Sequence, residues 1–507
     1  MLVKSLVSSL SLVLPCVLVG FGNVQKVAST TNIWAASYEE KTDNNAELIS
    51  ATTDSFNSVK DIHYSRIRVG KLAQAATNKT YYVSGSGNDS NNGLTKTTAF
   101  RTLQRAANLV TAGGTVYVMN GTYTQEKDPT QAILLIYQKK GAPDAHITFK
   151  AYPGHNPVLK SSNSYAIIIG GSSYIDIEGF TLIGSNNQIS LKYAQQQKNN
   201  LNNPLTRGTG ISIAASSYVN GIPTHYSHHV VIRNNNISKF GGGGVNTNLA
   251  DYITIENNVI YETCLYTPFG TSAISTLHNW NTDNNTTDYK MIIRGNTIHS
   301  NISYIPWYAR KDGTISEGHG IIIDDAMNTQ ITSSHRVYTG KTLIANNIIY
   351  KNGASGINVF KSSNVDIVNN TTYQNAQSAD LPYLGEIDSV MADRVRIFNN
   401  IMYAKKDGYV NSTYKSQNIM SDKNLIYNSS KYNSSGFSNI VGKDPQFIDP
   451  AKSNFSLKYG SLAIDAGLSS FNGAKAPNID QRGVSRPQDG DGNGIAIVDI
   501  GALERTR

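Results

Sequence analysis

Cysteine is nearly absent from this chain of 507 residues, which contains only Cys16 and Cys264. Because Cys16 lies in an N-terminal segment that we expect to be removed, the mature chain cannot form an internal disulfide. Charged residues are also scarce, at 16%, and Lys and Arg form neither a run nor a patch interleaved with aromatic residues. The composition therefore argues against a nucleic-acid partner, while the net charge of +8 permits an acidic polysaccharide.

A helical period of apolar residues is missing from the middle of the chain. One short pattern recurs there instead: an aliphatic residue, a spacer and a pair that is usually Asn-Asn. It occurs at residues 232–235, 255–258, 293–296, 344–347, 367–370 and 397–400. Counted at the second Asn, the steps are 23, 38, 51, 23 and 30 residues, so the bare unit has 23 residues and three steps carry insertions.

Each unit has the pattern of a coil of β-strands. Short runs of Ile, Val, Thr and Tyr alternate with polar residues and are punctuated by Gly and Asn. This is typical of two or three strands per coil and not of a leucine-rich repeat. We expect the recurrent Asn to adopt the left-handed conformation at a corner, and stacked Asn amides to bond from coil to coil. The sequence thus predicts an all-β solenoid in which the Asn column is structural.

The first 29 residues have the pattern of a signal peptide. Lys4 precedes an apolar stretch from Leu6 to Phe21, and a short charged region before such a stretch is typical of export signals. A membrane anchor is the alternative, because the stretch is near the lower length limit for a span. Residues 30–77 are polar without periodicity and predict a leader or linker. We expect residues 78–507 to form a secreted, monomeric solenoid domain.

The two ends of the solenoid carry further motifs. Residues 81–93 are rich in Tyr, Ser, Asn and Gly, and residues 499–504 read Asp-Ile-Gly-Ala-Leu-Glu. Leu103, Ala106 and Ala107 lie on one face of a short helix that can cover the core of the first coil. These segments resemble the opening and closing segments of secreted right-handed parallel β-helix proteins with PbH1 repeats, a group that includes polysaccharide lyases of the pectate lyase type. The resemblance implies a right-handed parallel β-helix with an N-terminal helical cap.

A second recurrent position brings reactive side chains together. A Gly or small residue is followed by Ile or Val at positions 211, 245, 274, 321, 357 and, less regularly, 387. When the coils are aligned on that aliphatic residue, His278, Asp325 and Lys361 share one position, four residues further along. Stacked coils are about 4.8 Å apart, so these side chains can touch. Asp324 lies just before Asp325, and both face outward only if a turn begins there.

The insertions bring aromatic and polar residues toward the same surface. They contain Trp280, Trp307 and His319, and long loops on a rigid scaffold are where binding and catalysis concentrate. Either Trp could stack on a sugar ring or pack within its own loop. Together with Asn358 and Asp388, these residues are our candidates for substrate contacts.

The resemblance also implies a reaction. Residues 317–325 and 356–361 resemble the lyase pattern of an aspartate pair followed one coil later by a lysine. Cleavage of a uronate polymer by β-elimination needs a base for the proton beside the carboxyl group, and positive charge for the resulting anion. Lys361 would be the base, with Asp325 and His278 as further catalytic residues. Asp324 and Asp325 would hold Ca2+.

Other functions remain open. A glycoside hydrolase needs two carboxyl groups about 5 to 9.5 Å apart. Several pairs are available from Glu317, Asp324, Asp325, Glu386 and Asp388. A non-catalytic solenoid that binds carbohydrate at the cell surface would make the His278, Asp325 and Lys361 column a coincidence. A plain surface salt bridge between Lys361 and Asp325 is the simplest alternative.

A last motif lies near the C-terminus. Asp489, Asp491 and Asn493 have the spacing of a Ca2+ loop, but the twelfth position is Ile500, and the nearest carboxylate, Asp499, falls one residue early. That departure excludes a standard EF-hand. The sequence predicts a structural Ca2+ held by these three residues and Asp499, with a polar turn as the alternative.

Overall fold

The computed structural model describes residues 78–507 except 125–131, 220–221, 331–335, 434–435 and 437. The signal peptide and leader expected over residues 1–77 lie outside the described residues. All described residues belong to one compact unit. No helix in this part of the chain is long and apolar enough to cross a membrane.

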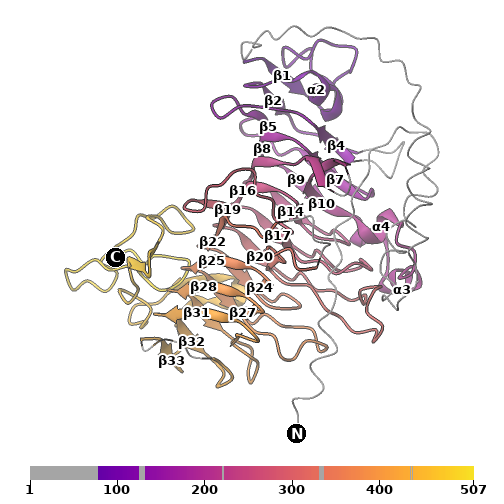
Figure 1. Cartoon of the computed structure of the whole chain (residues 1–507). Coiled ribbons are helices and arrows are strands. Elements are labelled where there is room, and N and C mark those ends of the chain that lie inside the picture. Colours follow the sequence, from indigo (N-terminus) through magenta and orange to yellow (C-terminus); the bar gives the residue numbers. More distant parts are fainter. Residues whose placement is uncertain (1–77, 125–131, 220–221, 331–335, 434–435, 437) are drawn as a thin grey trace. The chain divides into compact units, whose positions relative to one another are not determined.

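Three parallel sheets build this unit, and the chain passes through sheets A, B and C in turn in each coil (Figure 1). Sheet A contains β1 (Thr80–Val83), β2 (Thr115–Val118), β5 (Ile147–Ala151), β8 (Ser173–Glu178), β13 (His228–Arg233), β16 (Asp251–Glu256), β19 (Tyr289–Arg294), β22 (Lys341–Ala345), β25 (Ser363–Val368), β28 (Asp393–Phe398) and β31 (Gln417–Asp422). Sheet B contains β3 (Thr122–Tyr123), β6 (Val158–Lys160), β9 (Thr181–Ile183), β14 (Asn236–Ser238), β17 (Val259–Tyr261), β20 (Thr297–His299), β23 (Ile348–Tyr350), β26 (Thr371–Tyr373), β29 (Ile401–Tyr403), β32 (Leu425–Tyr427) and β33 (Ile440–Val441). Sheet C contains β4 (Ala132–Tyr137), β7 (Tyr165–Gly170), β10 (Thr209–Ala214), β15 (Val245–Asn248), β18 (Ile274–Leu277), β21 (Ile321–Asp324), β24 (Ile357–Phe360), β27 (Ile387–Val390) and β30 (Asn411–Ser412).

The remaining elements lie in the cap, the insertions and the C-terminal region. They are α2 (Leu103–Leu109), η3 (Asn186–Gln188), α3 (Leu191–Gln196), α4 (Pro204–Arg207), β11 (Ser216–Val219), β12 (Ile222–His225), β34 (Phe447–Asp449), η4 (Pro450–Lys452), β35 (Asn454–Leu457), β36 (Ser470–Phe471) and β37 (Ala474–Lys475). Helix α2 buries Leu103, Ala106 and Ala107, as its sequence predicted. The Thr102 side chain accepts a hydrogen bond from Arg105 N and so begins the helix.

The inward column of sheet C is the one that the sequence alignment predicted. Ile274, Ile321, Ile357 and Ile387 stand in register on successive coils, and all are fully buried. Alternation along each strand sends every second side chain outward, so Asp324 faces away from the core while Ile321 and Ile323 fill it.

In the Asn-Asn pair at the corner between sheets A and B, the two residues have different structural roles. The first residue takes the left-handed conformation, with φ of 58° at Asn234 and 53° at Asn369. The second forms a buried ladder in which each side-chain amide donates to the next coil, as from Asn347 Nδ2 to Asn370 Oδ1 at 2.9 Å. The predicted left-handed corner and the predicted bonded Asn column are both confirmed. The first Asn of the pair forms the corner, and the second forms the column.

A second Asn ladder, which the sequence analysis missed, lies at the corner between sheets B and C. It contains Asn301, Asn352 and Asn375, each five residues beyond a member of the first ladder. It ends at Glu386, whose two carboxylate oxygens accept hydrogen bonds from N and Nδ2 of Asn375. Burial raises the pKa of Glu386 to about 8. This carboxyl group, considered above for hydrolysis, is therefore engaged in the fold.

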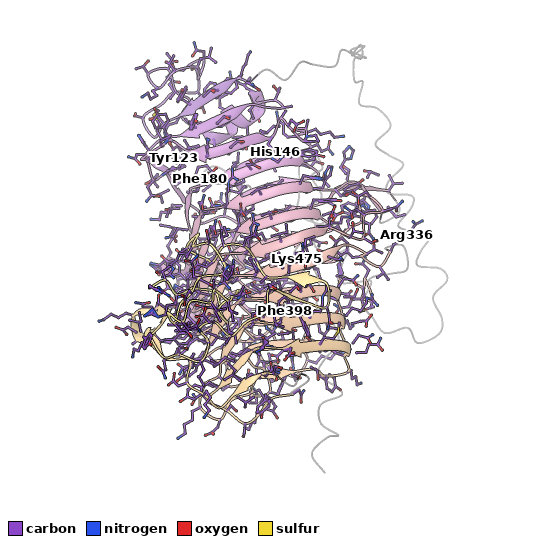
Figure 2. The ribbon with its side chains drawn as sticks, turned by 90° about the vertical axis from the view of Figure 1, so that its left-hand side faces the viewer. Tyr123, His146, Phe180, Arg336, Phe398 and Lys475 are labelled. Atoms are coloured by element: carbon purple, nitrogen blue, oxygen red, sulfur yellow. The ribbon has the colours of Figure 1, made fainter. Side chains whose placement is uncertain are left out.

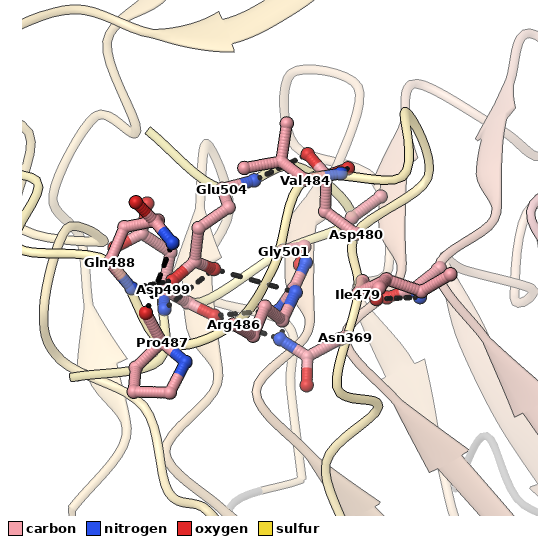
Figure 3. A network of polar contacts seen from close by, with 12 residues as sticks. Asn369, Ile479, Asp480, Val484, Arg486, Pro487, Gln488, Asp499, Gly501 and Glu504 are labelled. Carbon is pink, nitrogen blue, oxygen red and sulfur yellow. Dashed lines mark hydrogen bonds and ion pairs between the residues drawn. The ribbon is translucent and has the colours of Figure 1, made fainter. Parts of the chain in front are cut away.

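Residues 443–507, here called the closing segment, fold back against the outside of the coils. Phe398 of β28 packs against Phe471 and Ala474 beside Lys475, and Figure 2 labels Phe398 and Lys475. At the Asn corner, Asn369 Nδ2 donates to Asp499 O at 2.8 Å. The buried Arg486 donates to Asp499 O and Gly501 O and forms an ion pair with Glu504 (Figure 3). The closing segment thus satisfies corner amides that would otherwise need water.

Candidate active site

The turns after five successive strands of sheet C, β15, β18, β21, β24 and β27, present one column of side chains. Its members are Leu249, His278, Asp325, Lys361 and Met391, and their φ values lie between 44° and 52°. Asp325 N donates to Phe360 O and Lys361 N to Val390 O, both at 2.9 Å, so the column is in register. A left-handed conformation costs a non-Gly residue about 1 kcal/mol or more. Because Leu249 and Met391 adopt it too, the turn belongs to the coil, and the choice of side chain carries the chemistry.

His278 and Asp325 form a buried pair within this column. His278 Nε2 lies 3.2 Å from Asp325 Oδ2. Asp325 Oδ1 accepts hydrogen bonds from N and Oγ1 of Thr329, and Oδ2 accepts one from Gln330 N at 2.8 Å. Burial alone would raise the pKa of Asp325, but these hydrogen bonds hold it below its usual value. Asp325 therefore anchors the turn and the loop that follows it.

Asp324 is a buried carboxyl group on the outward face of β21. It is 2% exposed, and its Oδ1 has no hydrogen-bond partner among the described residues. Burial raises its pKa well above the usual value, and the carboxyl groups of Glu317 and Asp325 raise it further, while Lys361 lowers it. Burial and the neighbouring carboxyl groups thus favour the neutral form of Asp324. The turn that begins at Asp325 is the one that the sequence analysis required for both residues to lie outside the core.

Lys361 carries an ammonium group at the edge of an apolar cluster. The side chain is partly exposed, and its Nζ lies 5.3 Å from the centroid of the Phe360 ring. Within the described residues it forms no ion pair, so the salt bridge with Asp325 is not made. The cluster, here called the apolar wall, consists of Ile322, Phe360, Val390, Met391 and Tyr414.

A second polar group lies at the other end of the same strands. His319 Nδ1 accepts a hydrogen bond from Ser355 N, so Nε2 carries the ring hydrogen, 3.5 Å from Glu317 Oε2 and 3.3 Å from the Asn358 amide. Ser355 Oγ donates to Asp388 Oδ2 at 2.6 Å. Burial raises the pKa of Glu317 to about 7 and that of Asp388 to about 6, and lowers that of His319 to about 3. The group therefore supplies buried hydrogen-bonding side chains, of which His319 is neutral near pH 7.

The two tryptophans of the insertions differ in exposure. Trp280 is partly exposed and lies beside Tyr226, with 5.8 Å between ring centroids. Trp307 is only 5% exposed and packs against Tyr308. Trp280 thus has ring surface open to solvent, whereas Trp307 lies within its loop.

Calcium does not fit Asp324 and Asp325 as they lie here. Both oxygens of Asp325 already accept hydrogen bonds, and burial favours the protonated form of Asp324. Among the described residues, the group of acidic, His or Cys side chains that brings its ligand atoms within 4.8 Å of one another lies elsewhere, at Asp465, Asp489 and Asp491.

In the closing segment, this acidic group shares Asp489 and Asp491 with the predicted Ca2+ loop, and Asn493 Nδ2 donates a hydrogen bond to Asp491 Oδ2 at 2.9 Å. Asp499 is fully buried and accepts hydrogen bonds from Asp465 N and Arg505 N, and burial raises its pKa to about 7. Asp465 stands beside Asp489 and Asp491 instead. The role of calcium in this loop stays a prediction.

A protein-family model matches the first part of the described chain. Residues 81–265 match the family model described as the Pel9A-like, right handed beta helix region. No curated protein matches the chain. The matched region ends before His278, so it leaves the candidate site outside.

Solved structures give distant likenesses. The chain is similar to pectate lyase Pel9A, with a TM-score of 0.47, 16% identity and coverage of 84% of this chain and 96% of that one. It is also similar to a structure titled "Glycoside hydrolase", with a TM-score of 0.46, 9% identity and coverage of 75% and 99%. A third likeness is to XylC in complex with xylose, with a TM-score of 0.40, 12% identity and coverage of 84% of this chain and 99% of that one. Likenesses this distant say nothing about the reaction. With the stacked parallel sheets and the match over residues 81–265, the chain is a right-handed parallel β-helix, as its sequence resemblance implied.

Proposed function

We propose that this protein is a secreted polysaccharide lyase that cleaves a uronate-containing polymer by β-elimination, with Lys361 as the base. One observation carries the proposal. A partly exposed lysine without an ion pair among the described residues stands on a turn that recurs from coil to coil, and its charge reaches the buried carboxyl group of Asp324. Such a side chain is available to take a proton, since no carboxylate holds it in place.

The proposed step uses the neutral amine of Lys361. Its Nζ takes the proton from C5 of the uronate, beside the carboxyl group. The electron pair of the C5–H bond forms the C4–C5 double bond, and the C4–O bond to the next sugar breaks. Water protonates the departing oxygen. Lys361, now charged, faces the anion that develops at the carboxyl group and stabilises it.

The neighbouring residues have supporting roles in this proposal. Asp325 fixes His278 and the turn that carries the column. His319, Asn358 and Asp388 are buried beneath the same face, where His319 and Asp388 bond to Ser355 and support the strands that carry the column. Trp280 supplies a ring for stacking against a sugar. The predicted export signal at residues 1–29 belongs to the same proposal, because a polymer substrate lies outside the cell.

Hydrolysis is the second candidate, and a specific observation favours it. Glu317 and Asp388 have pKa values raised by burial to about 7 and about 6. A glycosidase needs one carboxyl group that stays protonated near neutral pH to act as general acid. The two reactions differ in their products, because only elimination leaves an unsaturated uronate.

The test incubates the native chain with pectic, alginate and glycosaminoglycan polymers and follows ultraviolet absorbance and new reducing ends together. Lys361→Ala is compared with Lys351→Ala, since Lys351 also stands on a left-handed turn, at φ 53°, but in another column. A rise in absorbance that Lys361→Ala abolishes and Lys351→Ala preserves supports the proposal. Reducing ends without absorbance would move the assignment to a hydrolase, and binding without either product to a carbohydrate-binding solenoid.

A further inference from the structure

The surroundings of Lys361 are apolar on one side. Its Nζ lies 5.3 Å from the centroid of the Phe360 ring. Met391 follows Lys361 in the turn column, and Met391 N donates to Tyr414 O. Met391 and Tyr414 are both partly exposed and pack against Phe360 and Val390. A substituent that lies beside the base therefore meets a ring, a thioether and an aliphatic surface.

The other side of Lys361 is acidic. Glu317, Asp325 and Lys361 all act on the Asp324 carboxyl group, and hydrogen bonds hold the pKa of Asp325 below its usual value, which favours its negatively charged form. Arg310, whose charge reaches Glu317, is already held by Asp312 through hydrogen bonds of 3.0 and 2.6 Å. Asp324 and Asp325 do not fit a calcium ion, for the reasons given above. A substrate carboxylate would thus bring one more negative charge to a place with one ammonium group to meet it.

Esterification of the uronate removes this conflict. Loss of the C5 proton from a carboxylate gives a dianion, which needs strong positive charge for stabilisation. Loss of the same proton from an ester gives a monoanion, and the proton is more acidic. We infer that this site takes a uronate polymer whose carboxyl groups are methyl esters, with the ester methyl group against the apolar wall. This inference rests on the lyase proposed above and names its substrate class.

The atoms balance without a further reactant. Lys361 Nζ takes the C5 proton, the C4–O bond breaks with formation of the C4–C5 double bond, and water protonates the departing oxygen. The ester stays intact in the unsaturated product.

The experiment compares polygalacturonate with the same polymer after methyl esterification, each with a chelator and with added Ca2+. The expected result is at least tenfold faster formation of unsaturated product from the ester, unchanged by the chelator. Faster cleavage of the acid form, or a rate on the ester that depends on Ca2+, would overturn the inference and leave the lyase standing. Absence of unsaturated product from both polymers would overturn the lyase proposal and the inference together.

A substitution tests the apolar wall directly. Met391→Arg places a second cation beside Lys361, so we expect the preference for the ester over the acid form to fall at least threefold. Met420→Arg is the matched control, because Met420 is an exposed methionine on β31 outside the wall. An unchanged preference in Met391→Arg, with thermal melting showing a folded protein, would contradict the inference.

Discussion

The corner between sheets A and B and the outward face of sheet C differ in how fully their buried polar groups are hydrogen-bonded. At the corner between sheets A and B, Asn370 donates from N and Nδ2 to Asn400 Oδ1, and its own Oδ1 accepts from Asn347. On the outward face of sheet C, Asp324 Oδ1 and Asp388 Oδ1 are buried without a partner among the described residues. An unsatisfied buried group costs about 1 to 3 kcal/mol. The corner therefore stabilises the stack, whereas the face retains polar groups that the stack does not need, which is what a binding site requires.

The largest effect is expected when Lys361 is replaced by an apolar residue that another coil carries at the same position. Lys361→Met gives Lys361 the side chain that Met391 carries on the next coil, so the turn keeps a residue type that it accepts. We expect kcat/KM to fall about 10³-fold, because a general base contributes about 10² to 10⁴. The free energy of unfolding should change by less than about 0.5 kcal/mol. Loss of stability in urea with full activity per folded molecule would contradict the assignment.

The opposite result is expected at the corner. Asn347→Ala removes hydrogen bonds to Asn296, Asn370 and Ile293 O and leaves their groups buried. The free energy of unfolding should fall by about 2 to 4 kcal/mol. Activity at low temperature should be retained. Denaturant titration measures the first quantity, and Asn284→Ala, at an exposed position, is the control.

Stability should depend on pH through the buried carboxyl groups near sheet C. Burial raises the pKa of Glu317 to about 7, so the folded chain holds a proton that the unfolded chain loses near pH 4.3. The free energy of unfolding is then highest below about pH 4, and falls as the pH rises through about 7. Glu317→Gln should reduce this pH-dependent loss of unfolding free energy by on the order of 2 kcal/mol. Urea titrations below about pH 4 and above about pH 7 measure the loss in both proteins. Glu178→Gln on β8 should leave it unchanged.

A smaller effect is expected at the two tryptophans, one of which should act on substrate binding and the other on stability. Trp280 is partly exposed, so Trp280→Ala should raise KM about fivefold to tenfold with little change in stability. Trp307 is 5% exposed, so Trp307→Ala should instead lower the melting temperature. A KM effect confined to Trp307→Ala would reverse the roles of the two loops.

The smallest effect is expected in the closing segment. If Asp465, Asp489 and Asp491 hold Ca2+, the ion should raise the melting temperature over that in chelator by a few degrees, since binding at 100 times Kd contributes about 2.7 kcal/mol. Asp491→Asn should abolish the shift, while Asp144→Asn should not. Equal melting temperatures for the native chain with and without Ca2+ would show that the loop is a polar turn.

Much of the scaffold could be predicted from local patterns. The 23-residue unit, the inward column at Ile274, Ile321 and Ile357, and the buried face of α2 all follow from periodicity, because stacked coils repeat the same short-range geometry. The second ladder escaped notice because its Asn residues stand outside the recurrent pair. Its spacing of five residues was the signal.

The candidate site was predictable only as a set of positions. Alignment of coils places His278, Asp325 and Lys361 in one column, and the backbone register agrees. Alignment could not reveal that Thr329 and Gln330 occupy the Asp325 carboxylate, that Trp307 is buried, or that Asp465 lies beside Asp489. Each of these depends on a loop or on the closing segment, whose path is not repeated from coil to coil.

By itself, therefore, the sequence determined the stack of β coils and which side chains share a coil position, because every coil repeats the same local pattern of strand, turn and inward aliphatic residue. The right hand of the stack was implied by the family resemblance alone. Only the tertiary structure decided which of those side chains remain available. Burial and hydrogen bonds from distant segments set the charge of Asp324, Glu317 and Asp388 and leave Lys361 without an ion pair among the described residues. Such contacts join residues far apart along the chain, and no local pattern encodes them.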